Sequence, residues 1–142
     1  MESSFIGYSR GHYSSKSFQA VNPANGEQLP NHYAFASDED VNLACKLADQ
    51  ASLKLAGLSG QEKAKFLRTL ADGIEGIVED LVGVMTQETG LPELRVRGET
   101  GRTCGQLRMF AQLVEDGNWV DARIDRAQPD RKPLPKPDLR SM

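Results

Sequence analysis

The chain has 142 residues, of which 39% are hydrophobic, 26% charged and 6% aromatic, and its formal net charge is −3. This composition excludes an intrinsically disordered chain, and a chain without a basic excess is a poor partner for nucleic-acid phosphates. No apolar run reaches the ~18 residues of a membrane span, and the N-terminus lacks the basic and apolar regions of a secretory signal. We therefore expect a cytoplasmic protein with no nucleic-acid and no membrane partner.

Cysteine and histidine are rare in this chain, which contains only Cys45, Cys104, His12 and His32. The two cysteines lie far apart, without the short spacing of a metal or redox motif, and no carboxylate cluster accompanies the histidines. We therefore expect no metal site. We expect both cysteines to be small, partly buried apolar residues.

Residues 1–36 are expected to form strands and turns. The segment 17–21 alternates in polarity, residues 22–27 read Asn-Pro-Ala-Asn-Gly-Glu, and a second short run covers 32–36. Proline presets φ and Asn-Gly tolerates positive φ, so the middle segment has strong turn chemistry. The pattern predicts a β-hairpin.

The first predicted helix begins after Ser37. Ser37 and Asp40 have the spacing of a capping box, with Asp in place of the usual Glu. An apolar stripe then recurs on one face, which predicts an α-helix. Its members are Val41, Ala44, Ala48, Ala51 and Leu55.

The second predicted helix begins at a capping box formed by Ser59 and Glu62 and ends at Gly90. Gly73 and Gly76 weaken its middle, so we expect a kink or break there. Its predicted core stripe comprises Leu67, Leu70, Ile74, Val78, Leu81 and Met85.

The third predicted helix opens at Pro92 and runs to about Asp116, with Gly117 as its capping residue. The glycine-rich segment 98–105 lacks the spacing of a phosphate loop and lies within the helical pattern. A core stripe in the second half comprises Leu107, Phe110 and Val114; a polar stripe in the first half comprises Arg95, Glu99, Arg102 and Gln106.

The last 24 or so residues change to an extended pattern. Val120, Ala122 and Ile124 alternate with polar residues, as in a half-exposed strand. Four prolines between positions 129 and 137 then predict an extended connector, and a second strand is expected to start at Leu139.

Five strings resemble the N-terminal part of an NAD(P)-dependent aldehyde dehydrogenase. They occur in the expected order, at residues 22–27, 59–71, 88–92, 106–119 and 133–142. The last two are similar to the α-ketoglutaric semialdehyde dehydrogenase branch of that family. The resemblance covers nearly the whole chain from about Ser17 onward.

The resemblance implies an α+β fragment of the α/β aldehyde dehydrogenase fold in three parts. Residues 1–36 are the N-terminal strands and hairpin. Residues 37–117 are a helical part that packs on a Rossmann-type cofactor domain. Residues 118–142 begin an arm through which such enzymes form homo-oligomers.

The chemistry that the resemblance implies is oxidation of an aldehyde to a carboxylate. Hydride passes to NAD or NADP from a thiohemiacetal on a catalytic Cys, and a Glu serves as base for hydrolysis. No residue of this chain matches the catalytic, metal or cofactor-binding positions, and neither cysteine matches the nucleophile. We therefore expect an N-terminal fragment that is inactive by itself, binds no cofactor alone, and has the remainder of the enzyme as its partner. The alternative is a stand-alone helical interaction module, or the product of a truncated gene.

The polar stripe is the one place where the resemblance implies contact with substrate. In the family this helix lies beside the substrate tunnel, and α-ketoglutaric semialdehyde carries a carboxylate away from its aldehyde. The hypothesis is that Arg102 grips this carboxylate, oriented by Glu99. Thr103 and Gln106 would be neutral contacts. The alternative is a solvated helix face with one intrahelical ion pair.

Overall fold

The computed structural model describes residues 1–12 and 14–141. Four α-helices and three two-stranded antiparallel sheets make up this part of the chain. In chain order the elements are β1 (Phe5–Ile6), β2 (Ser9–Arg10), β3 (Ser17–Val21), β4 (Gln28–Ala34), α1 (Asp38–Gly57), α2 (Gly60–Gly76), α3 (Val78–Thr89), α4 (Glu93–Asp116), the 3₁₀ turn η1 (Asn118–Val120), β5 (Arg123–Asp125) and β6 (Leu139–Ser141). The α+β class is confirmed. Among the described residues, no helix has an apolar stretch long enough to cross a bilayer.

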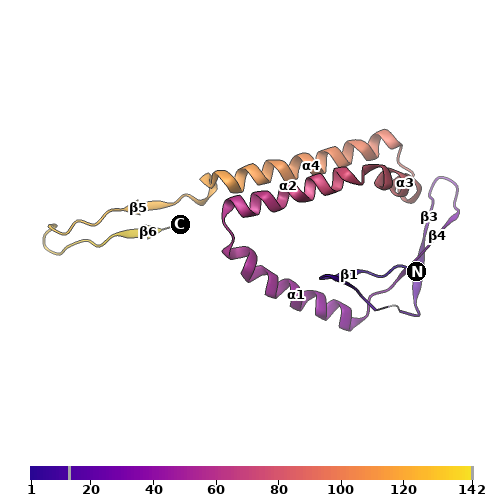
Figure 1. Ribbon diagram of the computed structural model, residues 1–142, viewed down its shortest axis with the longest axis horizontal. Coiled ribbons are helices and arrows are strands. Elements are labelled where there is room, and N and C mark those ends of the chain that lie inside the picture. Colours follow the sequence, from indigo (N-terminus) through magenta and orange to yellow (C-terminus); the bar gives the residue numbers. More distant parts are fainter. Residues whose placement is uncertain (13, 142) are drawn as a thin grey trace.

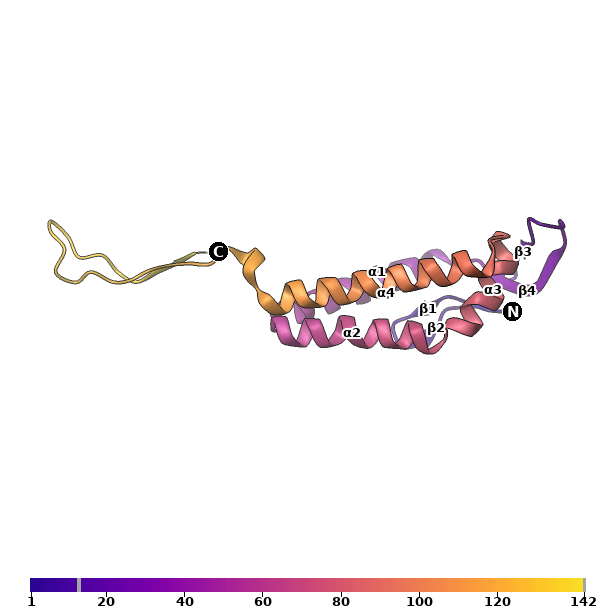
Figure 2. The same cartoon turned by 90° about the horizontal axis from the view of Figure 1, so that it is seen from above.

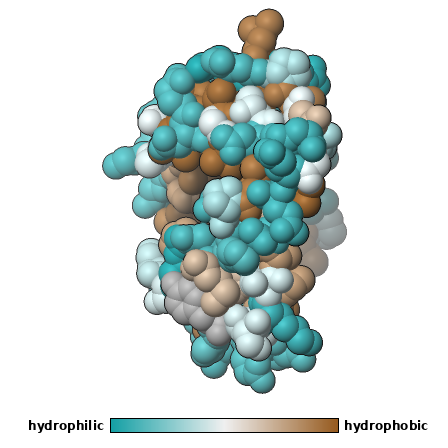
Figure 3. All heavy atoms as spheres, turned by 90° about the vertical axis from the view of Figure 1, so that its right-hand side faces the viewer, coloured by the Kyte–Doolittle hydropathy of each residue, from teal (hydrophilic) through white to brown (hydrophobic). Residues whose placement is uncertain are grey.

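Two helices form the centre of the molecule. Helices α2 and α4 lie side by side along most of their length, and α3 continues from α2 at the end near β3 and β4 (Figure 1). Helix α1 diverges from this pair in Figure 1, and the β5–β6 ribbon projects beyond the end of α4 in both Figure 1 and Figure 2. At the opposite end, apolar side chains are exposed between hydrophilic ones (Figure 3).

Both predicted capping boxes are present. The hydroxyl of Ser37 accepts from the backbone N–H of Asp40 at 3.1 Å, and the Ser37 N–H donates to the Asp40 carboxylate at 3.2 Å. Ser59 and Glu62 make the same reciprocal pair at 3.2 Å and 2.8 Å. Each box satisfies backbone donors that the first turn of a helix leaves free, which places the starts of α1 and α2.

The predicted break in the second helix is also present. It lies at Ile77, whose backbone (φ −115°, ψ 18°) separates α2 from α3. Downstream, Gly90 and Gly117 cap α3 and α4 in the left-handed conformation, with φ of 70° and 67°. Pro92 is the residue just before the first turn of α4, rather than within it.

Small side chains form the fully buried part of the contact between α2 and α4, and most of the predicted large stripe residues are half-buried beside them. Ala64, Ala71, Cys104 and Ala111 are completely buried, whereas Leu70 and Phe110 of the predicted stripes are 41% and 49% exposed. Short side chains let the two helix backbones approach closely, so the larger residues lie at the sides of the interface.

The apolar stripe of the first predicted helix is exposed in the described chain. Val41 is 53% exposed and Leu55 is 48% exposed. Helix α1 diverges from the α2–α4 pair (Figure 1), so most of its apolar face has no covering element within the described residues. The only residue of α1 that is fully buried is Asp40.

The hairpin of β3 and β4 confirms the first strand prediction. Phe18 pairs with Tyr33 across the ladder, with ring centroids 5.5 Å apart. The second strand starts at Gln28, four residues earlier than the pattern suggested, because the Asn22–Glu27 backbone bond closes a tight turn at 2.8 Å.

The C-terminal ribbon differs from the prediction at its start. Residues 118–120 form the η1 turn, and Asp121 has φ of 51°, so the extended strand begins at Arg123 and not at Val120. The second strand begins at Leu139 as predicted and pairs antiparallel with the first.

Candidate functional site: the polar face of α4

Three charged side chains line the predicted polar stripe at the start of α4. Glu99 lies between two arginines: its Oε1 is 2.6 Å from Nη2 of Arg95, and its Oε2 is 3.8 Å from Nη1 of Arg102. Spacings of four and three residues put all three side chains on one helical face. Glu99 therefore holds Arg95 closely and leaves the guanidinium of Arg102, whose side chain is 69% exposed, with free donors.

This face borders a shallow hollow of about 530 Å³. Its lining residues are Pro92, Leu94, Arg95, Gly98, Glu99 and Arg102. Gly98 contributes no side chain, which leaves room between the neighbouring turns, and a Cβ there would meet nothing within 4 Å. The hollow combines an apolar part at Leu94 with guanidinium donors, a combination suited to a short carboxylate-bearing molecule.

The other two residues of the hypothesis lie outside the hollow. Thr103 and Gln106 are exposed on α4 and are not among the residues that line it. The structure thus brings Arg102 and Glu99 together and adds Arg95. The sequence hypothesis did not assign Arg95 a role, although the stripe of four-residue and three-residue gaps contained it.

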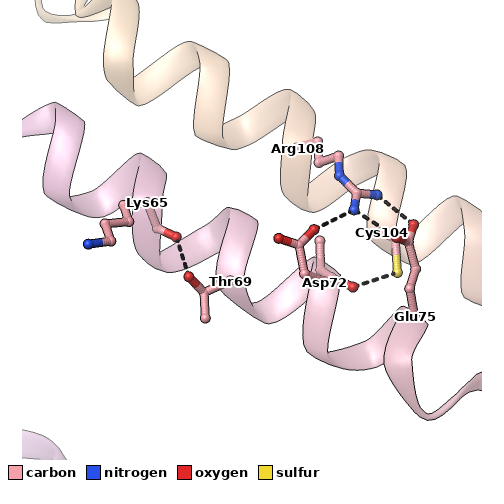
Figure 4. Close-up of polar contacts among 7 residues, drawn as sticks. Lys65, Thr69, Asp72, Glu75, Cys104 and Arg108 are labelled. Atoms are coloured by element: carbon pink, nitrogen blue, oxygen red, sulfur yellow. Dashed lines mark hydrogen bonds and ion pairs between the residues drawn. The ribbon is translucent and has the colours of Figure 1, made fainter.

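The two thiols occupy opposite environments. Cys104 is completely buried, and its Sγ lies 3.6 Å from the backbone carbonyl of Ala71 (Figure 4). Cys45 is exposed on α1. The expectation that both are partly buried is wrong: Cys104 lies where α2 and α4 meet, and Cys45 lies on a helix with little cover.

The glycine-rich segment 98–105 lies wholly inside α4. Its backbone N–H groups are engaged in the helix, and the buried hydroxyl of Thr100 donates to the Val96 carbonyl at 3.0 Å. Such a backbone cannot form the cradle of free N–H groups that binds phosphate. Within the described residues, no three or more His, Cys, Asp or Glu side chains gather as metal ligands do.

Arginine–carboxylate pairs connect α4 to the helices beside it. Arg108 of α4 donates to Glu75 at 2.6 Å and to Asp72 at 2.7 Å (Figure 4). Arg97 likewise donates to Glu79 of α3 at 2.8 Å. The charge-assisted bonds hold the pKa of Glu75 and of Glu79 below the usual value.

A third such pair joins Arg68 of α2 to Glu115 of α4. Its hydrogen bonds lower the pKa of the Glu115 carboxyl. These three pairs could not be predicted from the sequence, because each joins two different helices, and only the register of α4 against α2 and α3 shows which charges meet.

The comparisons with known proteins concern the chain as a whole. The aldehyde dehydrogenase family model matches residues 11–132. The chain is 40% identical over 136 residues to the α-ketoglutaric semialdehyde dehydrogenase of Acinetobacter baylyi, covering 96% of this chain and 26% of that protein. It is 41% identical over 128 residues to α-ketoglutaric semialdehyde dehydrogenase 2 of Azospirillum brasilense, covering 89% of this chain and 24% of that protein.

The fold has matches among solved structures. The crystal structure of PnpE in complex with nicotinamide adenine dinucleotide superposes with a TM-score of 0.74 at 24% identity, over 89% of this chain and 26% of that one. The chain thus spans about a quarter of the length of the relatives it matches. With a family model that matches most of its length and relatives at 40% identity, this chain belongs to the aldehyde dehydrogenase family.

Proposed function

We propose that the chain is the N-terminal part of an NAD(P)-dependent aldehyde dehydrogenase that oxidises α-ketoglutaric semialdehyde to the dicarboxylate. The identities of 40% and 41% to two proteins of that name support the substrate. A dinucleotide in the complex of a structural neighbour supports the cofactor class. The observation on which the proposal chiefly depends is the guanidinium of Arg102 beside the hollow on α4.

The proposed role of this face is to hold the end of the substrate that does not react. The carboxylate of the semialdehyde lies at the opposite end from its aldehyde, and a planar guanidinium can bind it through two parallel N–H donors. Glu99, already paired with Arg95 at 2.6 Å, offsets one of the two guanidinium charges and leaves a net positive charge for the substrate carboxylate. Thr103 and Gln106, which lie on α4 outside the hollow, remain proposed as neutral contacts to substrate.

The proposed chemistry is hydride transfer to NAD or NADP, and we propose that the 142-residue chain alone neither binds the dinucleotide nor turns over an aldehyde. The burial of the Cys104 thiol supports this, because a nucleophile must reach its substrate. We also propose a cytoplasmic location, packing of residues 37–117 on a cofactor domain, and homo-oligomer formation through residues 118–142.

A chimeric enzyme tests the proposal. This chain replaces the matching quarter of the Acinetobacter baylyi enzyme, and reduction of NAD and of NADP is followed with α-ketoglutaric semialdehyde. Controls are the intact relative, the relative without that quarter, and the 142-residue chain alone. We expect turnover only from the chimera and the intact relative. A folded chimera that lacks activity would contradict the proposed function, and so would turnover by the isolated chain.

A further inference from the structure

The carboxylate of Asp40 makes hydrogen bonds to two segments of the chain. Asp40 is only 2% exposed, although it lies in the first turn of α1. One group of donors is its own helix cap, the N–H of Ser37 at 3.2 Å. The other is the N-terminal segment: Nδ1 of His12 lies 2.7 Å away, and the His12 backbone N–H donates at 3.3 Å.

The N-terminal segment is attached at its other end to β4. The N–H of Glu2 donates to the His32 carbonyl at 2.7 Å, and the N–H of Ala34 donates to the Glu2 carbonyl at 2.8 Å. Between these two attachments the segment folds back on itself, with the Gly11 N–H donating to the Ser4 carbonyl at 2.8 Å. Residues 2–12 therefore form a strap that runs between the β3–β4 hairpin and the start of α1.

The strap also provides apolar cover for α1. Ile6 of β1 is buried, with 8% of its surface exposed. A Cβ on Gly7 would lie 3.0 Å from Cδ1 of Leu47. A Cβ on Gly11 would lie 3.2 Å from the Asp40 carboxylate, so the strap backbone approaches α1 closely there. Figure 1 shows β1 beside α1, while the rest of that helix diverges from α2 and α4.

We infer that Asp40 is a positioning residue that fastens the 2–12 strap to α1, and that this attachment sets the position of α1 relative to the β3–β4 hairpin. Its hydrogen-bonding partners are the N–H of Ser37, the N–H of His12 and Nδ1 of the His12 ring, and an ionised carboxylate can accept from all three. An asparagine of the same shape turns an NH₂ group toward at least one of these donors and leaves buried polar atoms unpaired. The ionisable side chains beside the Asp40 carboxylate are those of Arg10 and His12.

The Asp40 carboxylate accepts from both the helix cap and the strap, and two variants separate these roles. Asp40→Asn leaves one acceptor oxygen in place of two, so the side chain can no longer accept from the cap and from the strap together. Ser37→Ala removes the hydroxyl that accepts from the Asp40 N–H but keeps the carboxylate that holds His12. Asp38→Asn removes one exposed negative charge from the same helical turn and touches neither contact.

Hydrogen exchange and limited trypsin cleavage after Arg10, both on the full 142-residue chain, measure the attachment. In Asp40→Asn we expect the amides of Ser4–His12 to exchange roughly 10-fold faster or more, with faster cleavage at Arg10. In Ser37→Ala we expect the first turn of α1 to exchange faster while the strap stays protected. In Asp38→Asn we expect the strap to exchange within about twofold of the parent.

His12→Ala keeps the inference testable if Asp40→Asn does not fold. It removes the 2.7 Å ring contact but keeps the backbone N–H, and His32→Ala on β4 is its matched control. We expect the strap amides to exchange faster than in the parent in His12→Ala and at the parent rate in His32→Ala. The inference is overturned if Ser37→Ala loosens the strap as much as Asp40→Asn, or if His12→Ala and His32→Ala behave alike.

Discussion

Gly60, at the start of α2, lies directly against the backbone carbonyl of Val114, near the end of α4, and a Cβ atom at position 60 would overlap with that oxygen. The two helices can converge at this end only because position 60 has no side chain. The overlapping atom belongs to a backbone, so it cannot move aside by a change of rotamer.

The first prediction follows from this contact. Gly60→Ala should lower the free energy of unfolding by about 1–3 kcal/mol, since the helices must separate to admit the methyl group. Gly73→Ala in the same helix is the control: a Cβ there meets nothing within 4 Å, so its better helix propensity should raise stability by up to about 1 kcal/mol. Urea unfolding of both variants measures the difference. Equal stability of the two would mean that the close contact is not formed.

The second prediction concerns acid stability. Arg108 lowers the pKa of Glu75, so folding is favoured when this carboxyl is ionised. A group with a depressed folded pKa contributes stability above its unfolded value, and this contribution is lost as pH falls through the folded pKa. Glu79 and Glu115 shift in the same direction. The melting temperature should therefore fall as the pH is lowered from about 5 to about 3.

A variant pair isolates the contribution of Arg108 to this pH dependence. Arg108→Met removes both the Glu75 and the Asp72 contacts and should make the acid-induced fall shallower. Arg102→Met is the control, because its closest described carboxylate oxygen is 3.8 Å away. Melting curves at several pH values compare them, and identical slopes for the two variants would exclude a special role for Arg108.

The third prediction concerns substrate choice in the chimeric enzyme. Arg102→Met should lower kcat/KM for α-ketoglutaric semialdehyde by roughly 10- to 150-fold, the effect of losing a charged contact of ~1.5–3 kcal/mol. Activity on an uncharged aldehyde of similar length should be nearly unchanged. Equal losses on both substrates, or none on either, would leave Arg102 as part of a solvated helix face without refuting the dehydrogenase activity.

The fourth prediction is that the isolated chain self-associates. Strands β5 and β6 pair only with each other, so each has an unpaired edge, and Ile124 is 66% exposed. Ile124→Lys should shift the mass measured by light scattering toward the monomer. Leu53→Lys, at an exposed position on α1, should shift it less. A monodisperse parent chain with a cooperative melt would contradict this and favour a stand-alone module.

Local signals predicted the helices well. The capping boxes at Ser37 and Ser59 act over three residues, and glycines near position 76 weaken a helix without help from distant parts of the chain. Burial was less predictable. Leu70 lies on a correctly identified helical face, but short side chains on both helices make the contact and leave it 41% exposed.

In the candidate site, too, the local spacing could be predicted but the side-chain contacts could not. Helical spacing correctly put Arg95, Glu99 and Arg102 on one face. The hypothesis paired Glu99 with Arg102, whereas Glu99 lies 2.6 Å from Arg95 and 3.8 Å from Arg102, since the closer partner depends on side-chain rotamers. The strap was not predicted either, because the contact between His12 and Asp40 joins residues 28 apart in sequence.

The continuity of α4 determines how the helical part can bend. Its 24 residues extend for ~36 Å, whereas the chain beside it is divided into α2 and α3 at Ile77. Arg108 holds α4 to α2 on one side of this joint, and Arg97 holds it to α3 on the other. Flexing at Ile77 would have to stretch one of these ion pairs, so α2, α3 and α4 should move together as one rigid body. Thermal bending should then concentrate where α1 joins α2 and where the β5–β6 ribbon leaves α4.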